Sequence, residues 1–170
     1  MLTQRMEDAL NEQINAELYS AYLYMAMAAH FSAEGLPGFA TWMHAQAREE
    51  QFHAEKFYNY IHERDGRVAL RAIDAPPAKW DSPLAAFQDT LAHERGVTER
   101  INRLMDLAVE EKDHATRGFL QWFVDEQVEE EDSVRQVIDE LKLVDGTGGG
   151  MFMLNRELGQ RTFSPPADAE

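Results

Sequence analysis

The chain has 170 residues, which is enough for one domain with a single hydrophobic core. Its 44% hydrophobic content predicts a globular protein, and the absence of cysteine excludes disulfides, iron–sulfur clusters and thiolate metal sites. The formal net charge of -15 argues against nucleic acid and anionic membranes as partners and favours cations, although acidity of this kind can also serve solubility alone.

The first predicted helix spans about residues 3–34, because helix-forming residues dominate and glycine and proline are missing from this stretch. Its core-facing positions recur at steps of three and four. They are Leu10, Ile14, Glu17, Ala21, Tyr24, Ala28 and Phe31. Tyr22 and Met25 make further faces apolar, which predicts burial on more than one side, against a second subunit. A looser monomeric core is the alternative.

No membrane segment or targeting signal is expected. The longest uncharged run, residues 18–33, is shorter than the roughly 20 residues of a spanning helix and contains three tyrosines. Acidic residues interrupt the N-terminal stretch where a signal peptide would be apolar. We therefore expect a soluble protein in the cytoplasm.

A turn at residues 35–38 leads into a second predicted helix over about residues 39–64, which Gly66 should end. Its core-facing positions are Met43, Gln46, Glu50, His53, Phe57 and Tyr60. Residues 66–81 then show no helical period. A helix of about 27 residues is about 40 Å long, whereas 16 extended residues reach about 53 Å. This connection can therefore run the whole length of a helical bundle.

Ser82 and Pro83 mark the start of a third predicted helix, which continues to about residue 111. Its core-facing positions are Leu84, Phe87, Leu91, Glu94, Thr98, Ile101, Met105 and Ala108. A break at 111–114, with Asp113 as a cap, starts a fourth helix that runs to about residue 144. Its core-facing positions are Thr116, Leu120, Phe123, Gln127, Glu130, Val134, Val137 and Leu141.

The C-terminal part is predicted to leave the bundle. A glycine-rich hinge at 145–150 precedes one or two helical turns at 151–158. We therefore divide the chain into a four-helix bundle (1–145), a short C-terminal helix (146–160) and a flexible tail (161–170). The fold class is all-α, with a long crossover between the second and third helices.

Polar residues interrupt the middle of all four core stripes, and the interruptions repeat. They are Glu17, Glu50, His53, Glu94, Gln127 and Glu130. Each of the pairs Glu17/Glu94, Glu50/Gln127, His53/Glu130 and Glu49/Glu126 is separated by 77 positions. Counted outward from the two predicted turns, the polar residues of each helical hairpin also lie at similar heights. The two hairpins should therefore bring these groups together at mid-bundle.

Several carboxylates gathered in a dry core would repel one another and have raised pKa values. A divalent or trivalent cation removes this repulsion. Glutamate and histidine without sulfur suit iron, manganese or, less selectively, zinc, and Glu50 is placed to bridge two metals. The alternative is a set of solvated or hydrogen-bonded polar residues, but four insertions with a shared offset and height are hard to reconcile with it.

Ferritin-like di-iron bundles carry a glutamate on two helices and Glu-x-x-His on the other two, so we identify this pattern by its likeness to a known one. The chain resembles a bacterial non-haem ferritin along nearly its whole length. The resemblance implies that Glu17, Glu50 and His53 bind one iron. It implies a second iron at Glu50, Glu94 and Glu130, with Gln127 nearby.

The resemblance also implies a third iron site on the cavity side, at Glu49, Glu126 and Glu129. Each of these residues lies one position before a core polar residue or its partner, and would face the inner rim of the bundle. Tyr24 matches the tyrosine beside the di-iron centre and is a candidate electron donor. An ordinary core aromatic is the alternative for Tyr24.

Some positions depart from related families. Gln127 and Glu130 stand where bacterioferritins have a second Glu-x-x-His, and Phe52 stands where they have the haem-ligating methionine, so no haem is expected. Rubrerythrins add a cysteine-rich domain that this chain lacks. Residues 114–118 lack the acids that line animal ferritin pores, so no route for iron into a shell is assigned. Five histidines are off the core stripes and are predicted to be surface residues: His30, His44, His62, His93 and His114.

The resemblance implies an iron-storage protein with ferroxidase activity. Fe(II) would be oxidised by oxygen or hydrogen peroxide, and Fe(III) would be deposited as a mineral inside a hollow homo-oligomeric cage of 24 subunits. Two other readings stay open: a di-metal peroxidase or oxidase of the same fold in a small oligomer, and a helical interaction module without metal.

Overall fold

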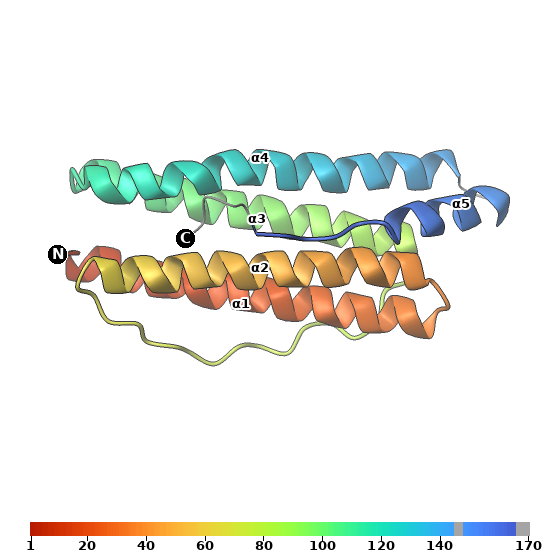
Figure 1. Cartoon of the computed structure of the whole chain (residues 1–170), viewed down its shortest axis with the longest axis horizontal. Coiled ribbons are helices and arrows are strands. Elements are labelled where there is room, and N and C mark those ends of the chain that lie inside the picture. The colour runs from red at the N-terminus through yellow and green to blue at the C-terminus, as the bar shows by residue number, and fades with distance from the viewer. Residues whose placement is uncertain (145–147, 166–170) are drawn as a thin grey trace.

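The computed structural model describes residues 1–144 and 148–165, and its described part is all-helical. The helices are α1 (Gln4–Ala33), α2 (Pro37–Glu63), α3 (Pro83–Glu110), α4 (His114–Leu143) and α5 (Gly148–Leu158). The first four form two antiparallel hairpins that pack into one bundle (Figure 1). The predicted fold class is confirmed. Among the residues that the structure describes, no helix is long and apolar enough to cross a membrane.

Side-chain caps define where three of the long helices begin. The side-chain oxygens of Thr3, Ser82 and Asp113 each accept a hydrogen bond at 3.1 Å from a backbone N–H three residues later. α2 lacks such a cap and starts at Pro37, two residues before the predicted start, because proline at the first helical position gives up an N–H that has no intrahelical partner. Gly35, at φ +73°, makes the tight turn before it.

The end of α2 differs in detail from the prediction. The residue with left-handed backbone is Asp65 (φ 57°), not Gly66. The Gly66 N–H instead donates to the Ile61 carbonyl at 2.8 Å, which closes the last turn. A Cβ on Gly66 would lie 2.9 Å from the Ile61 side chain, so glycine is needed for close packing at this point.

The connection from α2 to α3 runs along α1 from one end of the bundle to the other, as its length predicted (Figure 1). Asn11 holds it on both sides, since its amide donates to Arg67 O at 3.0 Å and its carbonyl accepts from Ala69 N at 2.7 Å. Asn15 donates to Ala72 O at 3.1 Å. The described part of this connection contains no strand.

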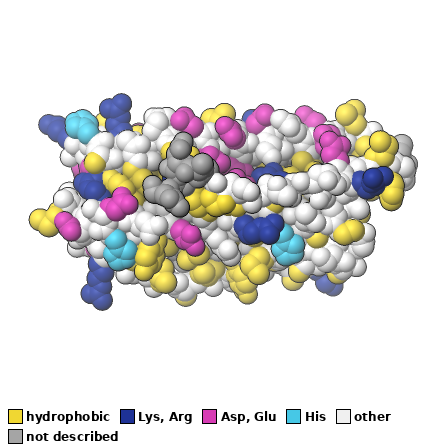
Figure 2. Space-filling model, in the orientation of Figure 1, with side chains coloured by type: hydrophobic (Ala, Val, Ile, Leu, Met, Phe, Trp, Pro, Cys, Tyr) yellow, Lys and Arg dark blue, Asp and Glu magenta, His cyan; other side chains and the backbone are white. Residues whose placement is uncertain are grey.

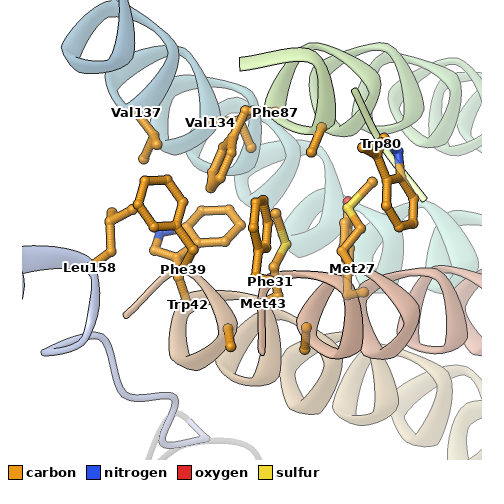
Figure 3. Packing of buried hydrophobic residues seen from close by; sticks show 14 of the residues in the cluster. Met27, Phe31, Phe39, Trp42, Met43, Trp80, Phe87, Val134, Val137 and Leu158 are labelled. Atoms are coloured by element: carbon orange, nitrogen blue, oxygen red, sulfur yellow. The ribbon is translucent and has the colours of Figure 1, made fainter. Parts of the chain in front are cut away.

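The core consists of two hydrophobic clusters, one toward each end of the bundle. The first cluster contains Phe31, Phe39 and Phe87 with residues of α4 and α5, and its aromatic rings face one another in Figure 3. The second contains Phe57, which stacks on Phe123 at 4.2 Å between ring centroids. These clusters leave the middle of the bundle to the polar residues described below.

α5 packs on the start of α2 and contributes Leu154 and Leu158 to the first cluster. Asn155 accepts a hydrogen bond from Gly38 N at 2.8 Å, and a Cβ on Gly38 would lie 1.5 Å from the Asn155 carbonyl oxygen. α5 starts at Gly148, earlier than predicted, so it takes in part of the predicted hinge. Residues 145–147 of that hinge and 166–170 of the predicted tail lie outside the described residues.

The apolar character of α1 has two sources in the structure. Leu23 and Met27 are buried within the subunit, which accounts for part of the apolar surface noted in the sequence. Tyr22 and Met25 remain 49% and 45% exposed. A second subunit that covers them stays a prediction.

Candidate metal centre

The six polar residues of the core stripes lie at mid-bundle and are all buried. They are Glu17 on α1, Glu50 and His53 on α2, Glu94 on α3, and Gln127 and Glu130 on α4. The most exposed of them, Gln127, has 5% relative accessibility. The repeat in the sequence therefore corresponds to one polar layer between two hydrophobic clusters.

The first hairpin contributes a compact ligand group. One ligand atom each from Glu17, Glu50 and His53 lie within 4.8 Å of one another, and His53 Nδ1 is 3.4 Å from Glu50 Oε2. Among the described residues, four buried polar atoms of the layer have no hydrogen-bond partner: Glu17 Oε2, Glu50 Oε2, His53 Nε2 and Glu130 Oε1. Such atoms are costly in a dry core unless they bind something. Oxygen and imidazole donors left free in this way fit a metal ion.

The second hairpin is held by more hydrogen bonds. The Tyr24 hydroxyl donates to Glu94 Oε1, and the Gln127 amide donates to Glu94 Oε2 and to the Glu94 backbone carbonyl, both at 3.2 Å. Glu130 Oε2 accepts from the Gln46 amide. In this geometry the amide nitrogen of Gln127 donates to Glu94. Gln127 therefore orients the Glu94 carboxylate. A metal-ligand role for Gln127 stays a prediction.

A second group lies toward the surface of the bundle. Ligand atoms of Glu49, His53, Glu126 and Glu130 lie within 4.8 Å of one another. The sequence places Glu129 with Glu49 and Glu126, but Glu129 is exposed and outside this set. Glu49, Glu126 and Glu129 nevertheless line one open pocket of ≈ 510 Å³. Burial is the largest cause that raises the pKa of Glu49 and Glu126, and the charge of Glu129 raises it further.

Burial is the main cause of the pKa shifts in the layer. It raises the pKa of Glu94 to about 7, and that of Glu17 in the same direction. For Glu50 and Glu130, burial and then repulsion by the other carboxylates raise the pKa well above the ordinary value. Burial lowers the pKa of His53 to about 3. The metal-free layer is thus rich in protonated carboxyls and holds a neutral imidazole, and a cation that binds there displaces protons.

Tyr24 is fully buried beside this layer. Burial, followed by the charge of Glu94, raises the pKa of Tyr24 well above 10, so the phenol keeps its proton and donates it to Glu94 in a hydrogen bond. This contact places Tyr24 next to the candidate ligands. Electron donation by Tyr24 stays a prediction.

Three residues that contact the candidate ligands have no predicted role. Gln13 donates to Glu17 Oε1 at 2.9 Å, and Gln46 donates to Glu130. Both glutamines stand four residues before a candidate ligand on the same helix face, and that spacing is a signal that could have found them. Arg161 forms an ion pair with Glu49 at 3.0 Å, and no feature of the sequence marks it.

Two of the five histidines predicted to lie on the surface, His93 and His30, are half-buried. His93 lies between α1 and α3, where Ser20 Oγ is 2.7 Å from its Nε2, and partial burial lowers the pKa of His93 to about 4. His93 lies in the groove between these two helices. The spacing of apolar residues along α3 does not by itself predict that contact. His44, His62 and His114 are exposed, and His30 is half-buried against Trp80.

Chemically, the layer offers carboxylate oxygens and an imidazole nitrogen from all four helices. Carboxylates can hold both oxidation states of iron, and the free atoms allow two adjacent cations to share Glu50. Because these donors are buried between two hydrophobic clusters, the layer suits a cation that replaces the protons of its carboxyls.

A family model described as a ferritin-like domain matches residues 7–144. The bacterial non-heme ferritin of Staphylococcus aureus (strain USA300) is 42% identical over 163 residues, which cover 96% of this chain and 98% of that protein. The ferritin of the same description from Staphylococcus epidermidis is 43% identical over 164 residues, covering 96% and 99%.

Solved structures agree with these relatives. An open-pore ferritin from the archaeon Archaeoglobus fulgidus superposes with a TM-score of 0.94 at 48% identity, over 95% of this chain and all of that one. A humanized archaeal ferritin gives a TM-score of 0.96 at 47% identity, over 97% and 100%. Together with the Glu/His layer, these matches show that the chain belongs to the ferritin family and is similar over nearly its full length to bacterial non-haem ferritins.

Proposed function

We propose that this chain is an iron-storage ferritin subunit that oxidises Fe(II) at the buried polar layer. The observation that carries this function is the set of unpartnered buried atoms on Glu17, Glu50, His53 and Glu130 in a chain of the ferritin family. Burial of these atoms without a partner costs stability, and a bound cation would supply the missing partner. Iron is the substrate here, because it is bound, oxidised and passed on.

In this mechanism Fe(II) enters the layer and displaces the protons of the buried carboxyls. One Fe(II) is held by Glu17, Glu50 and His53, whose ligand atoms lie close together. The family resemblance assigns the second Fe(II) to Glu50, Glu94 and Glu130, which are all buried in the layer. Each Fe(II) gives up one electron, and oxygen or hydrogen peroxide accepts the pair. Gln13 and Gln127 orient the carboxylates of Glu17 and Glu94 by the hydrogen bonds described above.

The finer assignments follow from the family. Fe(III) would leave the layer toward a third iron site at Glu49, Glu126 and Glu129 and then join a ferric mineral. The geometry favours Glu130 and His53 as additional neighbours of that site. The mineral would fill a hollow shell of 24 subunits in the cytoplasm, and the exposed Tyr22 and Met25 of α1 are suited to a contact between subunits.

Size-exclusion chromatography after loading with excess Fe(II) in air tests this function. We expect a large assembly that carries iron far beyond the capacity of its ligand groups, measured by elemental analysis of the eluted protein. Iron limited to the ligand groups of a small oligomer would instead favour a di-metal oxidase or peroxidase. Protein that elutes without bound iron would overturn both functions.

A further inference from the structure

The described residues after α5 run back along the bundle toward its middle, beside α2 (Figure 1). Two contacts fix this segment near the polar layer. Phe163 packs on Phe52 of α2 at 5.8 Å between ring centroids. The guanidinium of Arg161 lies over the Trp42 ring, 4.3 Å from its centroid. The segment therefore has a defined place on the open side of the second ligand group.

Arg161 contacts both helices that supply this group. Its guanidinium donates to Ser133 Oγ on α4 at 2.8 Å and to Gln46 Oε1 on α2, and it forms an ion pair with Glu49 at 3.0 Å. Its side chain is 22% exposed and that of Glu49 is 13% exposed, so water screens this pair only partly. A planar guanidinium with several N–H donors can make these contacts at the same time, whereas a lysine ammonium cannot reproduce their geometry.

The pocket beside Arg161 is strongly acidic. Glu49, Glu126, Glu129, Glu130 and Asp132 line it, and Arg161 is the only lysine or arginine among its described lining residues. Figure 2 shows acidic side chains spread along the α4 side of this face. Glu130, 3% exposed, keeps Oε1 without a hydrogen-bond partner, so the pocket retains a free ligand atom.

We propose that Arg161 is the resident counter-ion of Glu49, and that a metal ion that binds to Glu49 and Glu126 must compete with it for Glu49. The inference rests on the proposed function and adds a regulating residue to the inner site. Arg161 also holds Gln46, whose amide donates to Glu130. Displacement of Arg161 would therefore free Gln46 and alter its hydrogen bond to Glu130. In this way a metal ion at Glu49 and Glu126 would affect a ligand of the central layer.

Zinc binding to the assembled, metal-free protein tests the proposal without any redox step. Equilibrium dialysis with Zn(II) would compare wild type with Arg161→Ala, Arg161→Lys and Arg156→Ala. Arg156 is an exposed arginine of α5, so its variant matches the loss of charge. We expect Arg161→Ala to raise the affinity of the Glu49-dependent zinc site by about tenfold, a typical coupling between two competing ligands. Arg161→Lys should raise it less, and Arg156→Ala should leave it unchanged.

Glu49→Ala and the double variant Glu49→Ala/Arg161→Ala identify the site. Loss of Arg161 should have no effect once Glu49 is absent, because the two residues act on the same cation. Unchanged or weaker zinc binding in Arg161→Ala overturns the proposal, as does the absence of any zinc binding that depends on Glu49. The proposed function fails separately, if Glu50→Ala/His53→Ala binds as much zinc as wild type. Circular dichroism would confirm that each variant keeps its helices.

Discussion

The polar layer and the hydrophobic clusters differ most clearly along a single face of α2. Met43, Glu50 and Phe57 are seven residues apart, so they point the same way, and each is at most 1% exposed. Met43 and Phe57 belong to the two clusters, whereas Glu50 lies in the layer between them. Equivalent positions on one helix thus carry side chains with opposite effects on folding.

This contrast between apolar and charged buried side chains assigns stability to the clusters and metal chemistry to the layer. Burial of a large apolar side chain stabilises the fold by about 1.5–3 kcal/mol, whereas a buried carboxyl without a partner destabilises it. The clusters therefore hold the bundle together, and the layer is compatible with folding only because protons or metal neutralise it. Variants in the two regions should accordingly separate metal chemistry from stability.

The largest effect is expected from removing the layer's ligands. Glu50→Ala combined with His53→Ala should lower the initial rate of Fe(II) oxidation by roughly 1000-fold, because both candidate irons lose a ligand. The rate can be followed from the absorbance of Fe(III). Glu55→Ala combined with His62→Ala removes one exposed glutamate and one exposed histidine from the same helix and should oxidise iron normally. A double variant of Glu50 and His53 as fast as wild type would refute the assignment of the centre.

A cavity in the second cluster should have the next largest effect, this time on stability. Phe57→Ala removes a fully buried ring that stacks on Phe123, and should lower the free energy of unfolding by about 3–5 kcal/mol. Denaturant unfolding of metal-free protein at fixed subunit concentration measures this loss. The exposed Asn59→Ala is the control, with an expected change within about 0.5 kcal/mol. Loss of iron oxidation in folded Phe57→Ala would contradict the separation of the two regions.

The smallest effect concerns pH. Folded Glu94 keeps its proton up to a pKa of about 7, against an ordinary value of 4.5, and the pKa values of Glu50 and Glu130 are raised in the same direction. The folded state therefore binds more protons than the unfolded state, and its stability falls as pH rises through these values. His53, with its pKa lowered to about 3 from 6.5, acts oppositely, but only between these two values.

Above pH 6.5 the histidine contribution is complete, so only the carboxyls act. The metal-free protein should lose about 1–3 kcal/mol of stability between pH 6.5 and 8. Thermal or denaturant unfolding at several pH values measures this slope. Zn(II) should flatten the slope, and Glu50→Met, which removes one buried carboxyl, should make it shallower. Stability that is constant or rises over this window would mean that the layer is not protonated when metal is absent.

Local sequence signals predicted much of this architecture. Apolar spacing indicated four long helices, and Ser82 and Asp113 marked the starts of two of them. The length of residues 66–81 indicated a crossover along the bundle. The 77-residue offset indicated which polar residues share a level. These features depend on neighbours within a few turns of one helix, or on chain length, and both can be read from a linear sequence.

Contacts between helices that are distant in sequence were not predictable in this way. The packing of α3 on α1 brings His93 into contact with Ser20, and the packing of α2 on α4 groups Glu126 with His53 and Glu130. Rotation of each helix about its axis decides such contacts, and a shift of a few tens of degrees changes the neighbours. A hydrophobic stripe is too wide to define that rotation.

By itself, the sequence determined that four amphipathic helices carry acids and one histidine at mid-height, since helical periodicity and chain length are local properties. Only the tertiary structure decided which ligand atoms stay free of hydrogen bonds, and that Arg161 returns to pair with Glu49. Both depend on side chains brought together from separate elements, where burial removes water and leaves each polar atom dependent on the partner that packing supplies.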